Sequence, residues 1–464
     1  MTYGKLLVGL VLGCVAATAL VGPAGAAPGA AASAGAAGGG DRLFPFAGNG
    51  GYDVQRYRLD LHWQPGTNML VASEQLVATA TQSLSSFNLD LTGLTVNAVR
   101  VNGRQARFTR VGQELTVTPG KPLREDRRFV VSLDYSGVPK VVTDPDGSVE
   151  GWVPTEDGVF VVGEPQGSPS WFAVNNSPAD KAEFDVSMTV PEGLTAVGNG
   201  RLVSQRSARG KSTFRWVERS AMAPYLATIT VGRFDVARGV TPGGVPTYVA
   251  VDPAQAKSAA PVLAELPAMV DFFAGVYGKY PFEEVGAIVD HTPQVGYALE
   301  TQTKPVFDTA PDAETLAHEL AHQWFGDAVT VTRWSDIWLN EGFATWSEWL
   351  WTEHAGGRTA HDTFLALRAE PADSELWNPA PAELGDPGDI FARSVYDRGA
   401  MTLQALRERI GDDAFFKVLH CWYAEHRYGN VTTADFVALS ERVSGKNLQS
   451  FFQTWLHMPG KPAS

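Results

Sequence analysis

The chain has 464 residues, which is enough for two or three domains with hydrophobic cores. Hydrophobic residues make up 44% of the sequence and charged residues 19%, which is the balance of a folded soluble protein and not of a disordered or fibrous one. The net charge of −14 argues against nucleic acid or an anionic membrane surface as the main partner.

The amino-terminal residues have the pattern of an export signal. Lys5 precedes an apolar run over residues 6–21, and Ala24-Gly25-Ala26 has the small side chains of a signal peptidase site. We therefore expect a signal peptide over residues 1–26 and a secreted protein without a membrane span in its mature form. The Val-Leu-Gly-Cys run that ends at Cys14 could instead be a lipoprotein box, which would leave the protein lipid-anchored.

A linker and a β-rich domain are expected next. Residues 27–40 are almost all Ala and Gly, so they cannot bury enough surface to fold, and we predict a flexible linker. From residue 41 to residue 240, short runs alternate polar and apolar side chains and are separated by turn residues. We therefore predict an N-terminal β-sandwich domain over residues 41–240. Clear examples of the alternation are the runs 57–63, 129–135 and 184–190.

Residues 241–464 are predicted to form a second, mainly helical domain. Strands are expected over residues 246–251 and 285–289, with a helical stretch over residues 254–276 between them. A block of strands followed by a block of helices indicates an α+β protein of two domains. Further helices are expected over residues 359–368, 398–410, 412–428 and 433–443, and a long loop rich in Pro, Asp and Gly over residues 370–390.

The segment from residue 316 to residue 346 carries the clearest chemical signal. His318 and His322 are four residues apart, which places both imidazoles on one face of a helix. Glu319 completes the HExxH pattern of two zinc ligands and a carboxylate beside the metal's open position. Glu341 follows His322 by 19 residues, in a second predicted helix, and is the expected third ligand. Two His and one Glu indicate a catalytic site with one Zn²⁺ per chain.

The chemistry expected of this set is hydrolysis of an amide bond. A zinc ion with these ligands acidifies a bound water. Glu319 can take the proton of that water and pass it to the leaving amine. A bare HExxH pattern arises by chance in many helices, but Glu341 in the run Asn-Glu-Gly-Phe-Ala strengthens the prediction of a metal site.

The runs HELAHQWFGD (residues 318–327) and WLNEGFATW (residues 338–346) resemble the aminopeptidase N family of zinc metallopeptidases, which are of the gluzincin type. Residues 171–182 and 191–200 resemble the N-terminal β-domain of that family, and the similarity covers nearly everything after residue 50. The resemblance implies a saddle-like β-sandwich domain followed by a thermolysin-like catalytic domain. It also implies a short, two-domain member of the family with an open cleft.

The resemblance assigns residues that bind the substrate. Where the family has Gly-Ala-Met-Glu-Asn, this chain has Tyr-Ala-Leu-Glu-Thr over residues 297–301. Glu300 would bind the free α-ammonium of a peptide, and the strand backbone at Ala298 would align the substrate. The second amine contact of the family falls on Glu164, with Gln166 as the competing candidate.

Tyr396 lies in a run similar to the family's Tyr-x-Lys-Gly-Ala segment, and it would donate a hydrogen bond to the oxyanion of the reaction. The resemblance therefore implies a zinc aminopeptidase that acts on peptides with a free N-terminus. Three alternatives remain. A zinc endopeptidase would not need Glu300, a leukotriene-type epoxide hydrolase would run a different reaction at the same site, and a non-catalytic binding protein would run none.

Overall fold

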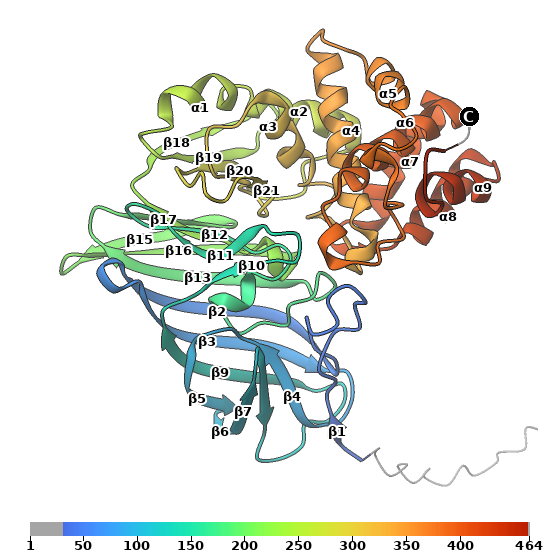
Figure 1. Cartoon of the computed structure of the whole chain (residues 1–464). Coiled ribbons are helices and arrows are strands. Elements are labelled where there is room, and N and C mark those ends of the chain that lie inside the picture. The colour runs from blue at the N-terminus through green and yellow to red at the C-terminus, as the bar shows by residue number, and fades with distance from the viewer. Residues whose placement is uncertain (1–30, 463–464) are drawn as a thin grey trace, which may run out of the picture. The chain divides into compact units, whose positions relative to one another are not determined.

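The computed structural model describes residues 31–462 (Figure 1). The predicted signal peptide, Cys14 and residues 27–30 of the predicted linker lie outside the described residues. A β-rich domain comes first and a mainly helical domain follows, which confirms the predicted α+β fold class.

The described part of the predicted linker differs from a flexible tether. Strand β1 (Ser33–Ala34) pairs in parallel with β4 (Leu84–Asp90), and the Gly39 N–H donates to the Ala47 carbonyl. A Cβ on Gly35 would lie only 2.6 Å from the carbonyl oxygen of Gly50. The sequence predicted flexibility from these small side chains. In the structure, the same small side chains allow the segment to lie against neighbouring backbone.

Three β-sheets form the β-rich domain of the described chain. The largest has the order β15-β16-β13-β2-β3-β9-β5-β6, and its long strands contain the three runs in which alternation predicted strands. One face of these strands is buried and the other is exposed, as their alternation requires. This sheet contains β2 (Tyr52–Gln64), β3 (Met69–Ala80), β5 (Thr95–Val101), β6 (Arg104–Gln105), β9 (Arg128–Gly137), β13 (Ala182–Pro191), β15 (Arg201–Ala208) and β16 (Lys211–Met222).

The two smaller sheets have the orders β1-β4-β8-β7 and β10-β11-β12-β17-β14. The second of them contributes to the site, because the chain around β11 and β12 leads into the loop that carries Glu164. Their remaining strands are β7 (Arg107–Val111), β8 (Glu114–Thr118), β10 (Val141–Thr143), β11 (Val149–Pro154), β12 (Val159–Val162), β14 (Thr195–Gly198) and β17 (Ile229–Gly232).

The passage between the domains differs from the predicted boundary at residue 240. Strand β18 (Asp235–Val240) pairs with β19 (Pro246–Val251), and both belong to the sheet β18-β19-β20-β22-β21 of the second domain. The tight turn closed by the Thr241 N–H and the Val245 carbonyl keeps the two strands together. The change of domain therefore precedes β18, and residue 240 lies at the turn of a hairpin.

The helical stretch predicted over residues 254–276 forms two helices, α1 (Ala256–Leu263) and α2 (Leu266–Tyr277). Pro267, in the first turn of α2, lacks the N–H that a continuous helix would need. By length and apolarity residues 256–277 would pass as a membrane span, but the buried face of α2 packs in the protein core.

Four helices follow the predicted positions to within two residues: α5 (Ala360–Arg368), α6 (Gly399–Ile410), α7 (Asp412–His426) and α8 (Thr433–Ser444). Helices α3 (Ala313–Ala321) and α4 (Trp338–His354) form the predicted metal site, and the short helix α9 (Gln449–Phe452) was not predicted. The strands of this part are β20 (Val285–Val289), β21 (Ala298–Leu299), β22 (Val306–Phe307), β23 (Val329–Val331) and β24 (Gly429–Val431).

A buried carboxyl group makes the stability of the β-rich domain sensitive to pH. Glu74 on β3 accepts hydrogen bonds from the Tyr135 hydroxyl at 3.0 Å and from the Ala173 N–H at 2.9 Å. Burial raises the pKa of Glu74 to about 8. The folded state therefore favours the protonated carboxyl.

We expect Glu74→Gln to weaken this dependence on pH. Because the folded pKa lies above the unfolded value of about 4.3, the stability from protonation is complete below about pH 4.3 and is lost as pH rises through about 8. Between about pH 5 and about pH 8 the wild type should lose free energy of unfolding relative to the variant, which keeps an acceptor oxygen. Urea denaturation at both pH values measures this difference, and parallel behaviour of the two proteins would contradict it.

Candidate active site

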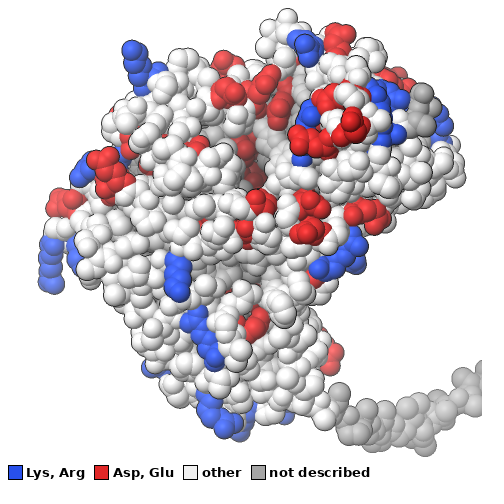
Figure 2. All heavy atoms as spheres, in the orientation of Figure 1, with Lys and Arg blue, Asp and Glu red and all other residues white. Residues whose placement is uncertain are grey.

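A cleft of about 610 Å³ brings together all eight predicted site residues. Among the residues that the structure describes, the lining of this cleft contains no Lys or Arg. Figure 2 shows acidic side chains gathered along the hollow on this face of the molecule. The lining residues are Asp146, Ser148, Glu164, Val295, Gly296, Tyr297, Ala298, Leu299, Glu300, Asp312, Glu314, Thr315, His318, Glu319, His322, Glu341, Glu348, Phe391 and Tyr396.

Helix α3 carries the HExxH residues, and its start is well defined by sequence. Asp312 is the N-cap, and its carboxylate accepts the Thr315 N–H at 2.8 Å. His318 and His322 then lie one turn apart at the end of the helix, with ring centroids separated by 4.7 Å. The predicted spacing therefore places both imidazoles together, as helical geometry requires.

Glu341 on α4 meets both imidazoles. Its Oε2 lies 3.2 Å from His318 Nε2 and 3.4 Å from His322 Nε2. Two ligands of a tetrahedral metal ion at about 2.1 Å from the ion are about 3.4 Å apart, so both imidazole nitrogens have the spacing from this oxygen that zinc needs. The donor set of two imidazoles and one carboxylate therefore fits Zn²⁺ in chemistry and in geometry.

Each histidine is held from its other nitrogen. His318 Nδ1 lies 2.5 Å from Glu348 Oε1, and His322 Nδ1 lies 3.0 Å from the Phe325 carbonyl oxygen. Such partners fix the ring orientation so that Nε2 points at the metal. Glu348 was not among the predicted site residues. The sequence does contain a signal for it: Glu348 follows Glu341 by seven residues, which is two helical turns, so both side chains lie on the same face of α4.

The charges of these residues prepare the site for a cation. Burial acts to raise the pKa of Glu341, but His322 and His318 outweigh it and lower the value to about 2. Burial acts to lower the pKa of His322, but Glu341 and other carboxylates outweigh it and raise the value to about 9. A divalent cation can take over the role of the imidazole protons beside this carboxylate.

Glu319 faces the same space from α3. It is buried, and its Oε2 has no hydrogen-bond partner among the described residues. Burial raises the pKa of Glu319 to about 8. A carboxylate with a raised pKa is a stronger proton acceptor than an exposed one.

Glu164 and Glu300 bring two further carboxylates next to Glu341. One oxygen atom from each of the three residues lies within 4.8 Å of the others, and all three residues are buried. Oε1 of Glu164 and Oε1 of Glu300 have no hydrogen-bond partner within the described part of the chain. Burial raises the pKa of both side chains, and the negative charges of neighbouring carboxylates raise it further. A cation bound here would relieve that repulsion.

The competing candidate for the amine contact lies elsewhere. Gln166 does not line the cleft, and its backbone N–H donates to Glu150 Oε1 at 2.8 Å. Of the two candidates, Glu164 is the one that faces the other site residues.

Ala298 lies in β21, which is the edge strand of its sheet and pairs with β22 on one side. Its neighbour Tyr297 reaches the β-rich domain, where its hydroxyl donates to the Val149 carbonyl at 3.1 Å. Both residues of β21, Ala298 and Leu299, line the cleft.

Tyr396 reaches the site because two helices approach closely. A Cβ on Gly342 would lie 2.8 Å from Gly399 Cα, so only glycine allows α4 and α6 to pack at this distance. Tyr396 lies in a π-helical turn over Ser394–Arg398, just before α6, and its ring centroid is 6.0 Å from that of His318. Burial raises the pKa of Tyr396 well above its ordinary value, so the phenol keeps its proton and can donate it in a hydrogen bond.

We expect Glu348→Ala to weaken zinc binding by about 10- to 100-fold, because His318 loses the partner that orients its ring. Competition with a chelator of known affinity measures the change. Glu353→Ala on the same helix is the matched control, since Glu353 contacts the Ala360 N–H and not a histidine. Unchanged zinc affinity in Glu348→Ala would show that the contact is not needed to hold the metal.

The geometry described above defines a class: a zinc metallopeptidase centre with three protein ligands and an adjacent carboxylate. The model of the Peptidase family M1 domain matches residues 283–455. The M1 zinc metallopeptidase of Deinococcus radiodurans has a similar structure, with a TM-score of 0.84 and 30% sequence identity over 91% of this chain and 98% of its own. A mutant of that enzyme bound to a Tyr-Ser-Ala substrate gives a TM-score of 0.83 over 92% of this chain and 99% of its own. The chain belongs to peptidase family M1.

Longer relatives agree with this assignment. Aminopeptidase M1-D of Oryza sativa subsp. japonica is 32% identical over 322 residues, which are 63% of this chain and 36% of the rice protein. Aminopeptidase N of Lactococcus lactis subsp. lactis is 29% identical over 322 residues, which are 63% of this chain and 38% of that protein. The chain thus spans less than two fifths of the length of these two relatives.

Proposed function

We propose that this protein is a zinc-dependent aminopeptidase that releases N-terminal residues from peptides. The observation that carries the proposal is the buried pair Glu164 and Glu300 beside the zinc-binding set. Their oxygen atoms and one of Glu341 lie within 4.8 Å of one another. These carboxylates would bind one cationic amine. An amine bound there would put the first peptide bond of a substrate next to the metal site.

His318, His322 and Glu341 are the proposed ligands of one Zn²⁺ per chain. When bound, the ion would act as a Lewis acid and lower the pKa of water in the cleft. Glu319 takes a proton from the attacking water as a new bond forms between the water oxygen and the carbonyl carbon. The same carboxyl then gives that proton to the leaving nitrogen as the peptide bond breaks.

Two further groups are proposed to act on the substrate. The Tyr396 hydroxyl donates a hydrogen bond to the oxygen that gains negative charge in the transition state, where a neutral donor has the largest effect. The backbone of β21 at Ala298 aligns the peptide, because an edge strand offers unpaired N–H and C=O groups to an extended chain.

The buried carboxylates favour an aminopeptidase over an endopeptidase. An internal peptide segment has no charged amine at the cleavage site, so it would leave Glu164 and Glu300 buried without a cation. The Deinococcus radiodurans relative was crystallised with a tripeptide, which supports short peptides as substrates of this chain as well.

We propose in addition that the protein acts after export. The basic start at Lys5, the apolar run over residues 6–21 and the small residues at 24–26 support a secreted enzyme. Attachment through a lipid at Cys14 is the alternative, and the mass of the mature protein distinguishes the two.

We expect the wild type to hydrolyse aminoacyl substrates with a free amine and to leave their N-acetylated counterparts almost untouched. Glu300→Ala should lower kcat/KM for the free substrate by roughly 10- to 100-fold, because a hydrogen bond to a charged group is worth about 1.5–3 kcal/mol. The acetylated substrate provides an internal control, since its hydrolysis should not change. Equal activity of the wild type on both substrates would contradict the proposal and favour an endopeptidase.

A further inference from the structure

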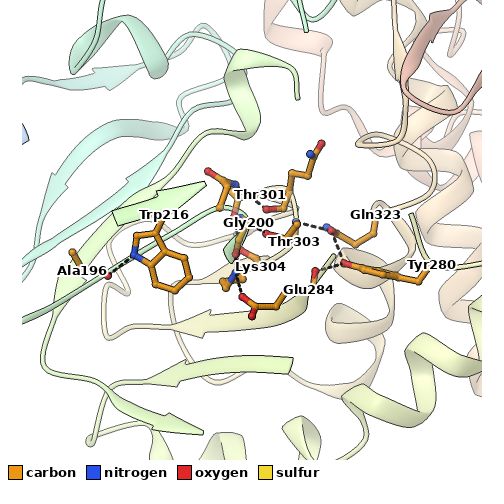
Figure 3. Close-up of polar contacts among 11 residues, drawn as sticks. Ala196, Gly200, Trp216, Tyr280, Glu284, Thr301, Thr303, Lys304 and Gln323 are labelled. Atoms are coloured by element: carbon orange, nitrogen blue, oxygen red, sulfur yellow. Dashed lines mark hydrogen bonds and ion pairs between the residues drawn. The ribbon is translucent and has the colours of Figure 1, made fainter. Parts of the chain in front are cut away.

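The segment that carries Glu300 is buried between the zinc-binding helix and the β-rich domain. Residues 300–304 are all buried, and only Glu300 of these five lines the cleft. Figure 3 shows Thr303 and Lys304 between Gln323 on one side and Gly200 and Trp216 on the other. Whatever fixes this segment therefore also fixes the carboxylate proposed to bind the substrate amine.

Gln323 contacts the segment from the side of the zinc-binding helix. It follows His322 directly and is fully buried. Its Oε1 accepts the Thr303 N–H at 2.7 Å, and its Nε2 donates to the Glu300 carbonyl oxygen at 3.2 Å. The Tyr280 hydroxyl also donates to Oε1, at 3.3 Å (Figure 3). One amide thus contacts the segment at two points, three residues apart.

The backbone at Thr303 needs this support. Its φ of 74° is in the left-handed region, which a β-branched residue seldom adopts. The Gly200 N–H donates to Thr303 Oγ1 at 2.8 Å, so contacts from both domains hold this conformation. Strained backbone of this kind persists where its surroundings impose it, and such positions are common at functional sites.

Lys304 connects the far end of the segment to the β-rich domain. Its ammonium donates to the Gly200 carbonyl and lies 4.8 Å from the centre of the Trp216 ring, and it pairs with Glu284 Oε1 of its own domain at 2.8 Å. Because Lys304 is held by contacts that do not involve Gln323 (Figure 3), loss of Gln323 should leave Lys304 in place and remove the contacts at Thr303 and Glu300.

We propose that Gln323 is a positioning residue that holds Glu300 in register with the zinc-binding helix. This inference rests on the proposed function, because it concerns the distance between the bound amine and the metal site. Gln323 does not line the cleft, so it acts through the backbone of Glu300 and not on the substrate itself. A shift of about 1 Å in such an anchor can cost up to about 100-fold in rate.

The test compares Gln323→Met with the wild type, both loaded with zinc. Methionine keeps the volume of the side chain and removes both contacts to the segment. We expect kcat/KM for a free aminoacyl substrate to fall roughly 10- to 100-fold, mainly through KM, while slow hydrolysis of the acetylated counterpart stays unchanged. Binding of leucinamide, followed by the rise in melting temperature that it causes, should weaken by a similar factor, and N-acetyl-leucinamide should remain a non-binder.

Gln404→Met is the matched control. Gln404 is also a buried glutamine of the second domain, and it accepts the Trp346 indole N–H at 3.2 Å and donates to Glu408 Oε1 at 3.2 Å. Its loss removes the same kind of hydrogen bonds without touching the Glu300 segment. It should lower the melting temperature and leave the ratio of activities on free and acetylated substrates as in the wild type.

Gln323→Asn gives the same test in a more conservative background, because its shorter amide keeps its polarity but cannot span both contacts. The inference is overturned if both Gln323 variants bind one zinc ion per chain and still discriminate free from acetylated substrate as the wild type does. A wild type that shows no such discrimination contradicts the proposed function instead, so the two failures can be told apart.

Discussion

Four buried carboxylates face one cleft, and the rest of the site depends on how their charge is balanced. Glu164, Glu300, Glu319 and Glu341 are all buried, and the described lining of the cleft has no Lys or Arg to pair with them. Burying unpaired carboxylates is costly, so such a cluster is stable only with cations or protons. In the proposed function, a zinc ion at Glu341 and a substrate ammonium at Glu164 and Glu300 would supply two such cations. The proposal therefore places two cations a short distance apart in this cleft.

The surrounding fold holds that separation. The contact between Gly342 and Gly399 lets α4 and α6 approach, and Glu341 and Tyr396 line the same cleft. Glu348 orients the ring of His318 from the same helix. On the other side, Gln323 and Lys304 hold the segment of Glu300 between the zinc-binding helix and the β-rich domain. The proposed sites for the metal and for the substrate amine thus share one support, because α3 carries the two histidines and Gln323 follows it directly.

Sequence reasoning succeeded where the relevant geometry is local. The spacing of His318 and His322 determines their common face on a helix, and the alternation in residues 57–63 determines a half-buried strand. Glu164 and Glu300 were found through resemblance, because nothing in their local pattern indicates that two residues so far apart meet. Glu348 was missed although the sequence shows its spacing from Glu341. A residue that orients a metal ligand is recognised only once the position of that ligand is known. The contacts of Gln323, the hairpin at residue 240 and the packing of residues 33–40 depend on tertiary structure, and no periodicity reports them.

The central claim is that His318, His322 and Glu341 hold zinc while Glu319 moves the proton, and one variant separates these roles. Zinc content and turnover should be measured together in Glu319→Gln, with the wild type beside it. The account predicts one zinc ion per chain in both proteins, and a loss of turnover in the variant of about 10²- to 10⁴-fold, the usual contribution of a general base. A variant that kept its zinc and hydrolysed free aminoacyl substrates at the rate of the wild type would contradict it.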